Sequence, residues 1–259
     1  IYANARSLAG YLREKSDDID AARRLPPEVA ARLREAGMFR LMMPKAWGGP
    51  ELSPAEQVEV IEQLAMANSS AAWCVMIGCD SGFFAGYLDD AAGRELYPRL
   101  DMATAGSILP NGRAERVDGG FRVTGQWPFG SGISHADVIA LTCRLYEKGM
   151  PLMGPKATPV TCAMLTPASG VEIVDNWHTT GMRGTGSSDY RVTDLFVLER
   201  FLVNFRQPAH REGILWRRFT NFLPKVSGVA LGAARAAIDH VTGVMQNKVE
   251  MPSGRAYKN

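Results

Sequence analysis

At 259 residues, the chain is long enough for one large domain or two smaller ones with hydrophobic cores of their own. Hydrophobic residues make up 46% and charged residues 22%, and a formal net charge of +2 favours neither a nucleic-acid partner nor a membrane surface. The longest apolar run, Ala71 to Cys79, is too short to span a bilayer, and no signal segment opens the chain. The four cysteines lack metal-ligand spacing, so we expect buried, reduced thiols and a cytoplasmic protein.

The first hundred residues show the three- and four-residue spacing of apolar positions that is typical of amphipathic helices. The expected helices cover residues 3–20, a segment that Pro26-Pro27 begin and Gly37 ends, a segment that starts after Ser53, residues 71–88 and residues 91–97. Ser53 and Glu56 have the spacing of a capping box, and Ser69 or Ser70 is expected to cap the nearly all-apolar helix at 71–88. These segments predict an N-terminal all-α domain over residues 1–101.

From Met102 to about Phe205 the apolar period falls towards two, and glycine and proline become frequent. The expected strands are Thr104–Leu109, Glu115–Val117, Phe121–Thr124, Asp137–Leu145, Val160–Leu165, Val171–Val174 and Tyr190–Val197. Gly149 to Pro159 is expected to be a mobile loop. Strands without intervening helices favour a barrel or a sandwich, which we assign to residues 102–208.

The helical pattern returns from Ile214, and residues 226–245 predict a long helix rich in alanine. Small residues at this density allow close approach of helices, so the helix is expected to pack against other helices or against another subunit.

One stretch, Asp118 to Leu145, has an unusual pattern. Asp118-Gly119-Gly120 supplies the turn of a hairpin, and the strand that follows ends in Trp127 and Phe129. Gly130-Ser131-Gly132 then places one hydroxyl between two residues without side chains, so that backbone amides and this hydroxyl can approach a flat ligand. A serine in an ordinary bulge is the competing interpretation.

Several enzyme classes lack their motifs here. The sequence has no GxGxxG after a strand, no GxxxxGK[ST], no GxSxG and no HExxH, and its four histidines are scattered, so no metal site is expected. A cofactor that carries the chemistry would explain the scarcity of catalytic side chains.

Two motifs carry a resemblance to a known family. Residues 119–132 resemble the central β domain of the acyl-CoA dehydrogenase superfamily, and more closely its two-component flavin-dependent monooxygenases, such as the oxygenase components of p-hydroxyphenylacetate hydroxylase and dibenzothiophene monooxygenase. Residues 175–189, with the run Gly181-Met-Arg-Gly-Thr-Gly186, are similar to a second segment of that branch. The resemblance extends from about residue 5 to the end. It implies an α+β multidomain fold: the helical domain, the β domain with a flavin pocket, and residues 209–259 as the beginning of a C-terminal helical bundle whose remainder is missing.

The resemblance also implies site residues. Ser131, flanked by Gly130 and Gly132, corresponds to the residue that contacts flavin N5. The same comparison places Ser107, Ile108 and Leu109 along the flavin ring or the substrate, and Trp73 against the ring. An ordinary buried strand end and a plain core tryptophan are the respective alternatives. Trp127 is expected to be core, and Phe129 a pocket wall at most.

Two arginines could bind the flavin according to the resemblance. Arg183 could meet a flavin carbonyl or phosphate, with a surface ion pair to Asp189 as the alternative. Arg255 resembles the arginine that binds the flavin phosphates, frequently across a subunit boundary, with an exposed tail residue as the alternative.

The branch determines the expected chemistry. Where acyl-CoA dehydrogenases have Thr-Glu-Pro-x-x-Gly-Ser-Asp, this chain has Ala105 to Gly112 without the acidic residues, which argues against dehydrogenation of a CoA thioester. We therefore expect an oxygenase component that takes FMNH₂ or FADH₂ from a separate NAD(P)H:flavin reductase and uses O₂ to hydroxylate an aromatic or other small apolar substrate, or to oxidise sulfur or nitrogen. A homotetramer is implied, and the catalytic base is expected in the missing helices. An acyl-CoA dehydrogenase-type flavoenzyme and a non-catalytic scaffold are the alternatives.

Overall fold

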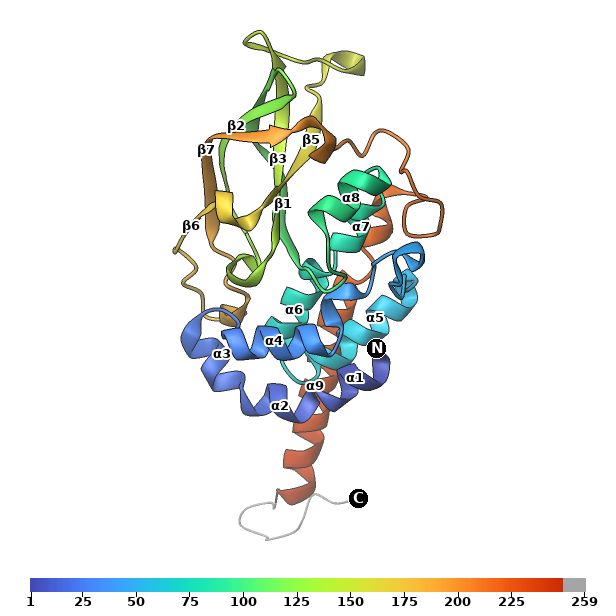
Figure 1. Cartoon of the computed structure of the whole chain (residues 1–259). Coiled ribbons are helices and arrows are strands. Elements are labelled where there is room, and N and C mark those ends of the chain that lie inside the picture. Colours follow the sequence, from blue (N-terminus) through green and yellow to red (C-terminus); the bar gives the residue numbers. More distant parts are fainter. Residues whose placement is uncertain (249–259) are drawn as a thin grey trace.

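The computed structural model describes residues 1–248 and has a helical layer, a curved sheet and a long final helix (Figure 1). The sheet stands above the layer formed by the N-terminal helices, and α7 and α8 lie beside it. The helices before the sheet are α1 (Tyr2–Ser7), α2 (Ala9–Glu14), α3 (Ser16–Ala22), α4 (Pro27–Glu35), α5 (Pro54–Ala65), α6 (Ser69–Gly78), α7 (Ser81–Ala85) and α8 (Asp90–Leu96). Buried apolar side chains from both parts form one continuous core.

The segment predicted as one helix over residues 3–20 is three short helices. The backbone leaves ideal helical angles at Lys15 (φ −84°, ψ 2°), and each of α1, α2 and α3 buries one residue, namely Ala5, Leu12 and Ile19. These lie seven positions apart, so their apolar period is the same in a continuous helix and in a broken one. The breaks let the chain curve around the core, as Figure 1 shows.

Helix α5 begins as predicted, whereas α6 does not. Ser53 and Glu56 form the reciprocal capping box of α5. At α6 the cap is Asn68, whose Oδ1 accepts from the amide of Ala71 at 2.9 Å, rather than Ser69 or Ser70. The expected helix over 71–88 is also divided into α6 and α7. Ser81 Oγ donates to the carbonyl of Met102 at 2.7 Å, which ties the start of α7 to the segment before the sheet.

The predicted β region is one mixed sheet. Its strands are β1 (Thr104–Val117), β2 (Gly120–Trp127), β3 (Val138–Glu147), β4 (Met150–Pro151), β5 (Thr161–Pro167), β6 (Glu172–Val174), β7 (Asp189–Leu198) and β8 (Leu202–Val203). The order is open, β6-β7-β2-β1-β3-β5-β8, with β4 added to β3. Only the pair β1 and β3 is parallel among these strands.

Two strands predicted separately are one irregular strand. Ser107 pairs with Leu141 and Gly112 pairs with Cys143. Between these two pairs β1 advances by five residues (112 − 107), whereas β3 advances by two (143 − 141). The three extra residues leave the ladder as a bulge, which a period-two pattern reads as the end of a strand. The expected loop at 149–159 contains β4 and a single 3₁₀ turn, Pro155–Ala157.

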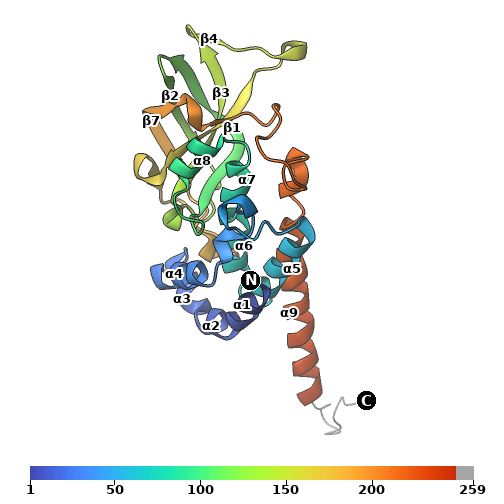
Figure 2. The same cartoon turned by 45° about the vertical axis from the view of Figure 1, so that its right-hand side comes forward.

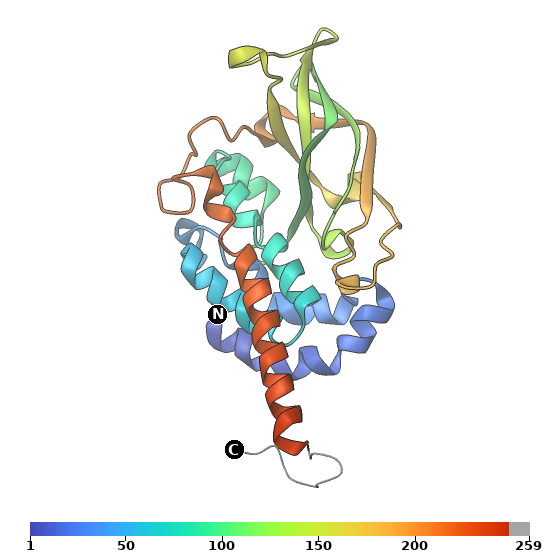
Figure 3. The same cartoon turned by 180° about the vertical axis from the view of Figure 1, so that it is seen from behind.

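Helix α9 (Val226–Asn247) runs along α5 and then projects from the domain (Figures 2 and 3). Its small residues permit this contact as predicted, because a Cβ added at Gly232 would lie 2.4 Å from the carbonyl oxygen of Glu62. Within residues 1–248, no helix combines the length and the apolar character needed to cross a membrane. The domain limits at residues 101 and 208 stay predictions.

Candidate active site

The two motifs singled out in the sequence lie against each other. The amide of Gly130 donates to the carbonyl of Ser188 at 3.0 Å, and the amide of Gly132 donates to the carbonyl of Thr185 at 2.8 Å. Gly132 has φ +72°, a left-handed conformation that favours glycine. Ser131 is thereby held at the junction of the loop after β2 and the loop before β7, with 6% of its surface exposed.

A chain of hydrogen bonds fixes the direction of the Ser131 hydroxyl. Thr185 Oγ1 donates to the carbonyl of Met182 at 2.9 Å, because a carbonyl can only accept. Each hydroxyl has one proton, so Ser187 donates to Thr185 (2.6 Å), and Ser131 in turn donates to Ser187 (2.7 Å). Ser131 Oγ also accepts from Trp73 Nε1 at 2.9 Å. Its proton is committed, and one acceptor position remains.

Trp73 reaches this hydroxyl because α6 packs on the same loops. Cys74 Sγ lies 3.7 Å from the carbonyl oxygen of Thr185. Gly184 sits so close to the helices that an added Cβ would lie 2.0 Å from Ile19 Cγ2 and 3.0 Å from Ser70 Cβ. Trp73 is half-buried and hydrogen-bonded to the loop serine, so the plain core tryptophan does not describe it.

Three large apolar side chains of the segments singled out in the sequence are exposed. Phe129, next to Gly130, is 59% exposed at φ +64°, and its ring meets Trp177 edge to face at 6.4 Å. Ile108 is 73% exposed and Leu109 42%, because the bulge in β1 turns them out of the sheet, so neither is an ordinary buried strand end. Trp127, in contrast, is core as expected and fully buried.

Ser107 lies where β1 leaves its regular path. Its amide donates to Tyr190 Oη at 2.8 Å, and its carbonyl accepts from Thr142 Oγ1 at 2.6 Å. Tyr190 Oη donates to the carbonyl of Ala140 at 3.0 Å, which fixes both strands at this level. Ser107 Oγ accepts only a long bond, from the amide of Leu109 at 3.3 Å. The hydroxyl proton of Ser107 is therefore available to a ligand.

Beside Ser107 lies a cavity of about 350 Å³, within the roughly 300–1,000 Å³ typical of small-molecule sites. Its wall consists of Ile77, Asp80, Phe83, Phe84, Thr104, Ala105, Gly106, Ser107, Ile108, Ala140, Thr142, Thr161, Cys162, Ala163, Phe205, Arg206, Phe219 and Phe222. Ile77 is four positions after Trp73 on α6, so both project from one face of this helix. One helix face thus connects the Ser131 junction to the cavity.

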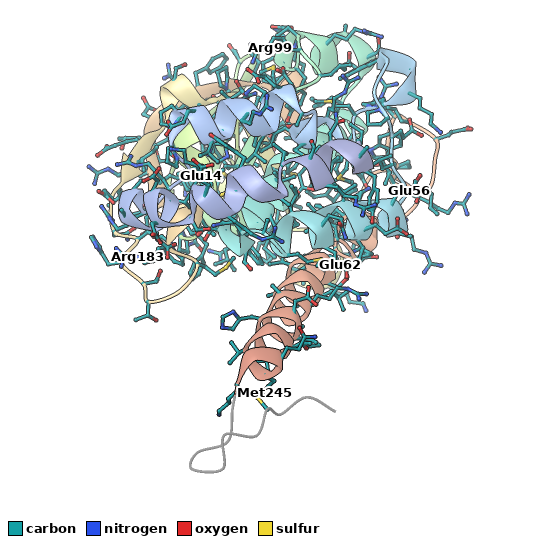
Figure 4. All side chains as sticks on the ribbon, turned by 90° about the horizontal axis from the view of Figure 1, so that it is seen from below. Glu14, Glu56, Glu62, Arg99, Arg183 and Met245 are labelled. Carbon is teal, nitrogen blue, oxygen red and sulfur yellow. The ribbon has the colours of Figure 1, made fainter. Side chains whose placement is uncertain are left out.

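Of the two arginines expected to bind the flavin, Arg183 lies within the described residues and Arg255 does not. Arg183 is half-buried at the outer edge of the molecule (Figure 4). Within residues 1–248 it makes no ion pair, and Asp189 accepts from Gln126 Nε2 at 2.9 Å, so the alternative of an Arg183–Asp189 pair is wrong. Arg255 lies outside the described residues.

Sequence reasoning missed four residues of this region. Thr185 and Ser187 belong to a motif that was recognised, but the pattern does not reveal that their hydroxyls continue from Ser131. Tyr190 was assigned only to a strand, and its sequence gives no signal of the bond to Ser107. Asp80 falls inside the helix expected over residues 71–88, and a position within a helix gives no sign that the side chain lines a cavity.

The titratable groups near the site are mostly buried and neutral. Burial raises the pKa of Cys162 to about 11 and that of Cys79 to about 12, and all four cysteines are free thiols. Burial also lowers the pKa of His135 to about 4, and the nearby Arg34 guanidinium adds to this effect. No histidine, cysteine or carboxylate cluster suited to a metal occurs in the described part of the chain.

Known proteins provide an independent comparison. Residues 3–96 match the family of the acyl-CoA dehydrogenase N-terminal domain. The chain is 32% identical over 248 residues to an indole-3-acetate monooxygenase of Pseudomonas putida, and the aligned region covers 94% of this chain and 61% of that protein. It is 30% identical over 252 residues to the oxygenase component of an FADH₂-dependent resorcinol hydroxylase of a Rhizobium species, covering 91% and 60%. The chain spans about three fifths of the length of these relatives.

Solved structures of similar fold include a hydroxylase and an FADH₂-bound protein. A 3-HSA hydroxylase from Rhodococcus sp. RHA1 superimposes with a TM-score of 0.85 at 25% identity, covering 97% of this chain and 67% of that one. XiaF from a Streptomyces species, in complex with FADH₂ and glycerol, gives 0.85 at 26% identity, covering 98% and 65%. Together with the two motifs that meet at Ser131, these matches show that the chain has the acyl-CoA dehydrogenase-like fold and is similar to flavin-dependent monooxygenases over about three fifths of their length.

Proposed function

We propose that the chain acts in the oxygenase component of a two-component flavin-dependent monooxygenase. It binds FMNH₂ or FADH₂ delivered by a separate NAD(P)H:flavin reductase, uses O₂ as co-substrate, and hydroxylates an aromatic or other small apolar molecule, or oxidises a sulfur or nitrogen atom. The relatives named for indole-3-acetate and resorcinol support an aromatic substrate.

The observation that carries the proposal is the direction of the Ser131 hydroxyl. Its proton is committed to Ser187, and its remaining capacity is to accept. Reduced flavin has a proton on N5, whereas N5 of oxidised flavin has only a lone pair. An acceptor at this position therefore complements the reduced form, and it would retain the N5 proton during the reaction.

Other residues fit a planar tricyclic ring. The exposed side chains of Ile108, Leu109 and Phe129 offer apolar surface that such a ring would cover, and Trp73 presents a half-buried aromatic edge beside Ser131. The Ser107 hydroxyl can donate to the ring or to the substrate. Arg183, which has no ion-pair partner among residues 1–248, could meet a flavin carbonyl or phosphate. Reduced flavin supplies the electrons that activate O₂ when it is bound.

The surface of α9 supports assembly into a homotetramer. Helix α9 projects from the domain as far as Met245 (Figure 4), and three apolar side chains of its second half are exposed, Ile238 (65%), Val241 (58%) and Val244 (50%). Exposed apolar surface of this kind is a common feature of helices that pack in an interface. The four free thiols are consistent with a reducing compartment, and we place the protein in the cytoplasm.

An anaerobic titration tests the function. The purified chain is titrated with reduced and with oxidised FMN and FAD, and air is then admitted while the absorbance and the release of H₂O₂ are followed. We expect the reduced form to bind more tightly. Replacing Ser131 by Ala should weaken reduced-flavin binding about fivefold, the equivalent of roughly 1 kcal/mol for one neutral hydrogen bond, and should raise H₂O₂ release.

Two outcomes would contradict the proposal. Tight binding of oxidised flavin that an acyl-CoA then bleaches would favour the dehydrogenase-type alternative. Failure to bind either form would favour the non-catalytic scaffold.

A further inference from the structure

The cavity beside Ser107 has an apolar and aromatic wall with one carboxylate in it. Five phenylalanines line it, namely Phe83, Phe84, Phe205, Phe219 and Phe222. Two threonines of the wall are already engaged: Thr104 Oγ1 is bonded to Ser81 and Tyr97, and Thr142 Oγ1 donates to the carbonyl of Ser107. Ser107, Thr161 and Arg206 are further polar residues of the wall, and their side chains are donors. Asp80 is the acidic residue among those that line the cavity.

The Asp80 carboxylate does not have the usual role of an aspartate at its position. Asp80 is the N-cap residue of α7, but its side chain accepts no hydrogen bond from the helix amides. It turns instead to Lys225, whose ammonium donates to Asp80 Oδ1 at 2.5 Å and to the carbonyl of Phe222 at 2.9 Å. Lys225 is 1% exposed and Asp80 14% exposed, so the ion pair is buried and its geometry is fixed.

One oxygen of this carboxylate remains free. Oδ1 is bonded to Lys225, whereas Oδ2 has no hydrogen-bond partner within residues 1–248. Asp80 is one of the residues that line the cavity, and its side chain keeps 14% of its surface exposed. A carboxylate oxygen can only accept hydrogen bonds. A hydrogen-bond donor on a ligand would therefore replace the bonds to water that Oδ2 loses on burial. A ligand with an O–H or N–H group would supply that proton, whereas a ligand without one would leave the oxygen unpaired.

We propose that Asp80 is a specificity-determining residue that selects aromatic substrates carrying an O–H or N–H donor, such as phenols and indoles. Lys225 acts as a positioning residue, because it holds Oδ1 and leaves Oδ2 directed at the ligand. The phenylalanine wall takes the ring, and one helix face of α6 connects this cavity to Ser131. This inference rests on the proposed function for the reaction, but the selection itself needs no flavin.

Binding of a matched ligand pair to the flavin-free chain tests it. Indole and 1-methylindole have nearly the same ring surface and differ in the N–H donor, and calorimetry or quenching of tryptophan fluorescence gives both Kd values. The buffer is held at pH 8, because burial raises the pKa of Asp80 above its usual range. We expect indole to bind at least about tenfold more tightly, as for a hydrogen bond to a charged group.

Replacing Asp80 by Asn should reduce that preference to about twofold or less while leaving the Kd of 1-methylindole within about threefold. Because Asp80→Asn leaves the Lys225 ammonium buried without a counterion, the double variant Asp80→Asn with Lys225→Gln provides a neutral pair. Thr161→Val, which removes another polar group of the wall, is the matched control and should keep the preference.

Equal affinities of the wild type for the two ligands would overturn the inference, as would an unchanged preference in both Asp80 variants or no saturable binding of either ligand. Reduced-flavin binding is measured separately. A wild type that binds reduced flavin but shows no indole preference would leave the proposed function standing and overturn only this inference. A wild type that prefers indole but does not bind reduced flavin would support this inference and overturn the proposed function.

Discussion

Trp73 and Ser131 lie 58 positions apart in the sequence, and the indole nitrogen of Trp73 donates a hydrogen bond to Ser131 Oγ across 2.9 Å. The bond joins helix α6 to the loop after β2, and so connects the helical layer to the sheet. The serine hydroxyl therefore depends for its position on the packing of the helices as well as on its own loop.

The direction of the hydroxyl chain predicts a change in redox preference. In Ser187→Ala, the Ser131 proton loses its acceptor and becomes free to donate to N5 of oxidised flavin. The ratio of the dissociation constants for oxidised and reduced flavin should then fall about fivefold, the equivalent of roughly one neutral hydrogen bond. Anaerobic titration with both forms measures it. Ser188→Ala, which removes a neighbouring hydroxyl outside this chain of bonds, should keep the wild-type ratio.

Trp73 is predicted to orient the acceptor. Trp73→Phe keeps an aromatic ring but removes the donor to Ser131, so the hydroxyl is held by Ser187 alone. We expect a roughly two- to fivefold higher share of O₂ released as H₂O₂, with the midpoint of thermal unfolding lowered by a few degrees at most. Trp47→Phe, which changes a tryptophan bonded to Asp90 instead, is the control. Equal peroxide release in both variants would contradict the assignment.

Close packing at Gly184 predicts a matched pair of stabilities. An alanine there would place Cβ 2.0 Å from Ile19 Cγ2, so α3 or the loop must move, at a cost of about 1–3 kcal/mol. The same movement would displace the carbonyls that hold the Gly132 amide and the Cys74 thiol. At Gly181 an added Cβ meets nothing within 4 Å. Urea unfolding should therefore show a loss of stability for Gly184→Ala and little change for Gly181→Ala.

The sequence predicts the features whose interacting residues are close together along the chain. The capping box at Ser53 and Glu56 could be recognised because both partners lie within one turn. The bulge at Ile108 and Leu109 could not, because it arises from pairing with β3, and alternation alone makes it two strands. For the same reason, the pattern around Ser131 indicates a ligand-facing hydroxyl but not its donor from α6.

The cavity was least accessible to sequence reasoning. Asp80 and Lys225 are separated by 145 positions, and each has an ordinary local interpretation, as a residue inside a helix and as a residue before one. The two residues pair only because the start of α9 packs beside the start of α7, and no local pattern specifies that contact. Arg183 shows the converse: its motif was recognised, but the expected pair with Asp189 depended on a side-chain direction that the motif does not define.

The cap of α6 predicts a difference between adjacent residues. Asn68→Ala removes the acceptor for the Ala71 amide and the 3.1 Å bond from Asn68 Nδ2 to Ser16 Oγ. The free energy of unfolding should fall by about 1–2 kcal/mol. Ser69→Ala changes a residue that already has helical conformation, and should have an effect of less than about 0.5 kcal/mol. A larger effect at Ser69 in denaturant unfolding would restore the cap that the sequence indicated.

His135 predicts how stability depends on pH. Its Nδ1 is buried without a hydrogen-bond partner in the described chain, its ring lies 5.6 Å from that of Phe39, and its pKa is lowered to about 4 by burial. The unfolded chain has a histidine pKa of about 6.5, so between pH 6.5 and 4 the unfolded state binds a proton that the folded state does not. This group therefore lowers stability as the pH falls through that window, by up to about 3 kcal/mol (roughly 2.5 pKa units at 1.36 kcal/mol each).

Below about pH 4 both states bind the proton, and the contribution of His135 stops changing. Carboxylates also titrate in this range, so the informative quantity is the difference between the wild type and His135→Gln, measured by urea unfolding at each pH. The variant should lose less stability between pH 7 and 4 than the wild type. His240→Gln, which removes an exposed histidine of α9, is the control and should follow the wild-type curve. Parallel curves for His135→Gln and the wild type would show that His135 takes up its proton without cost in the folded chain.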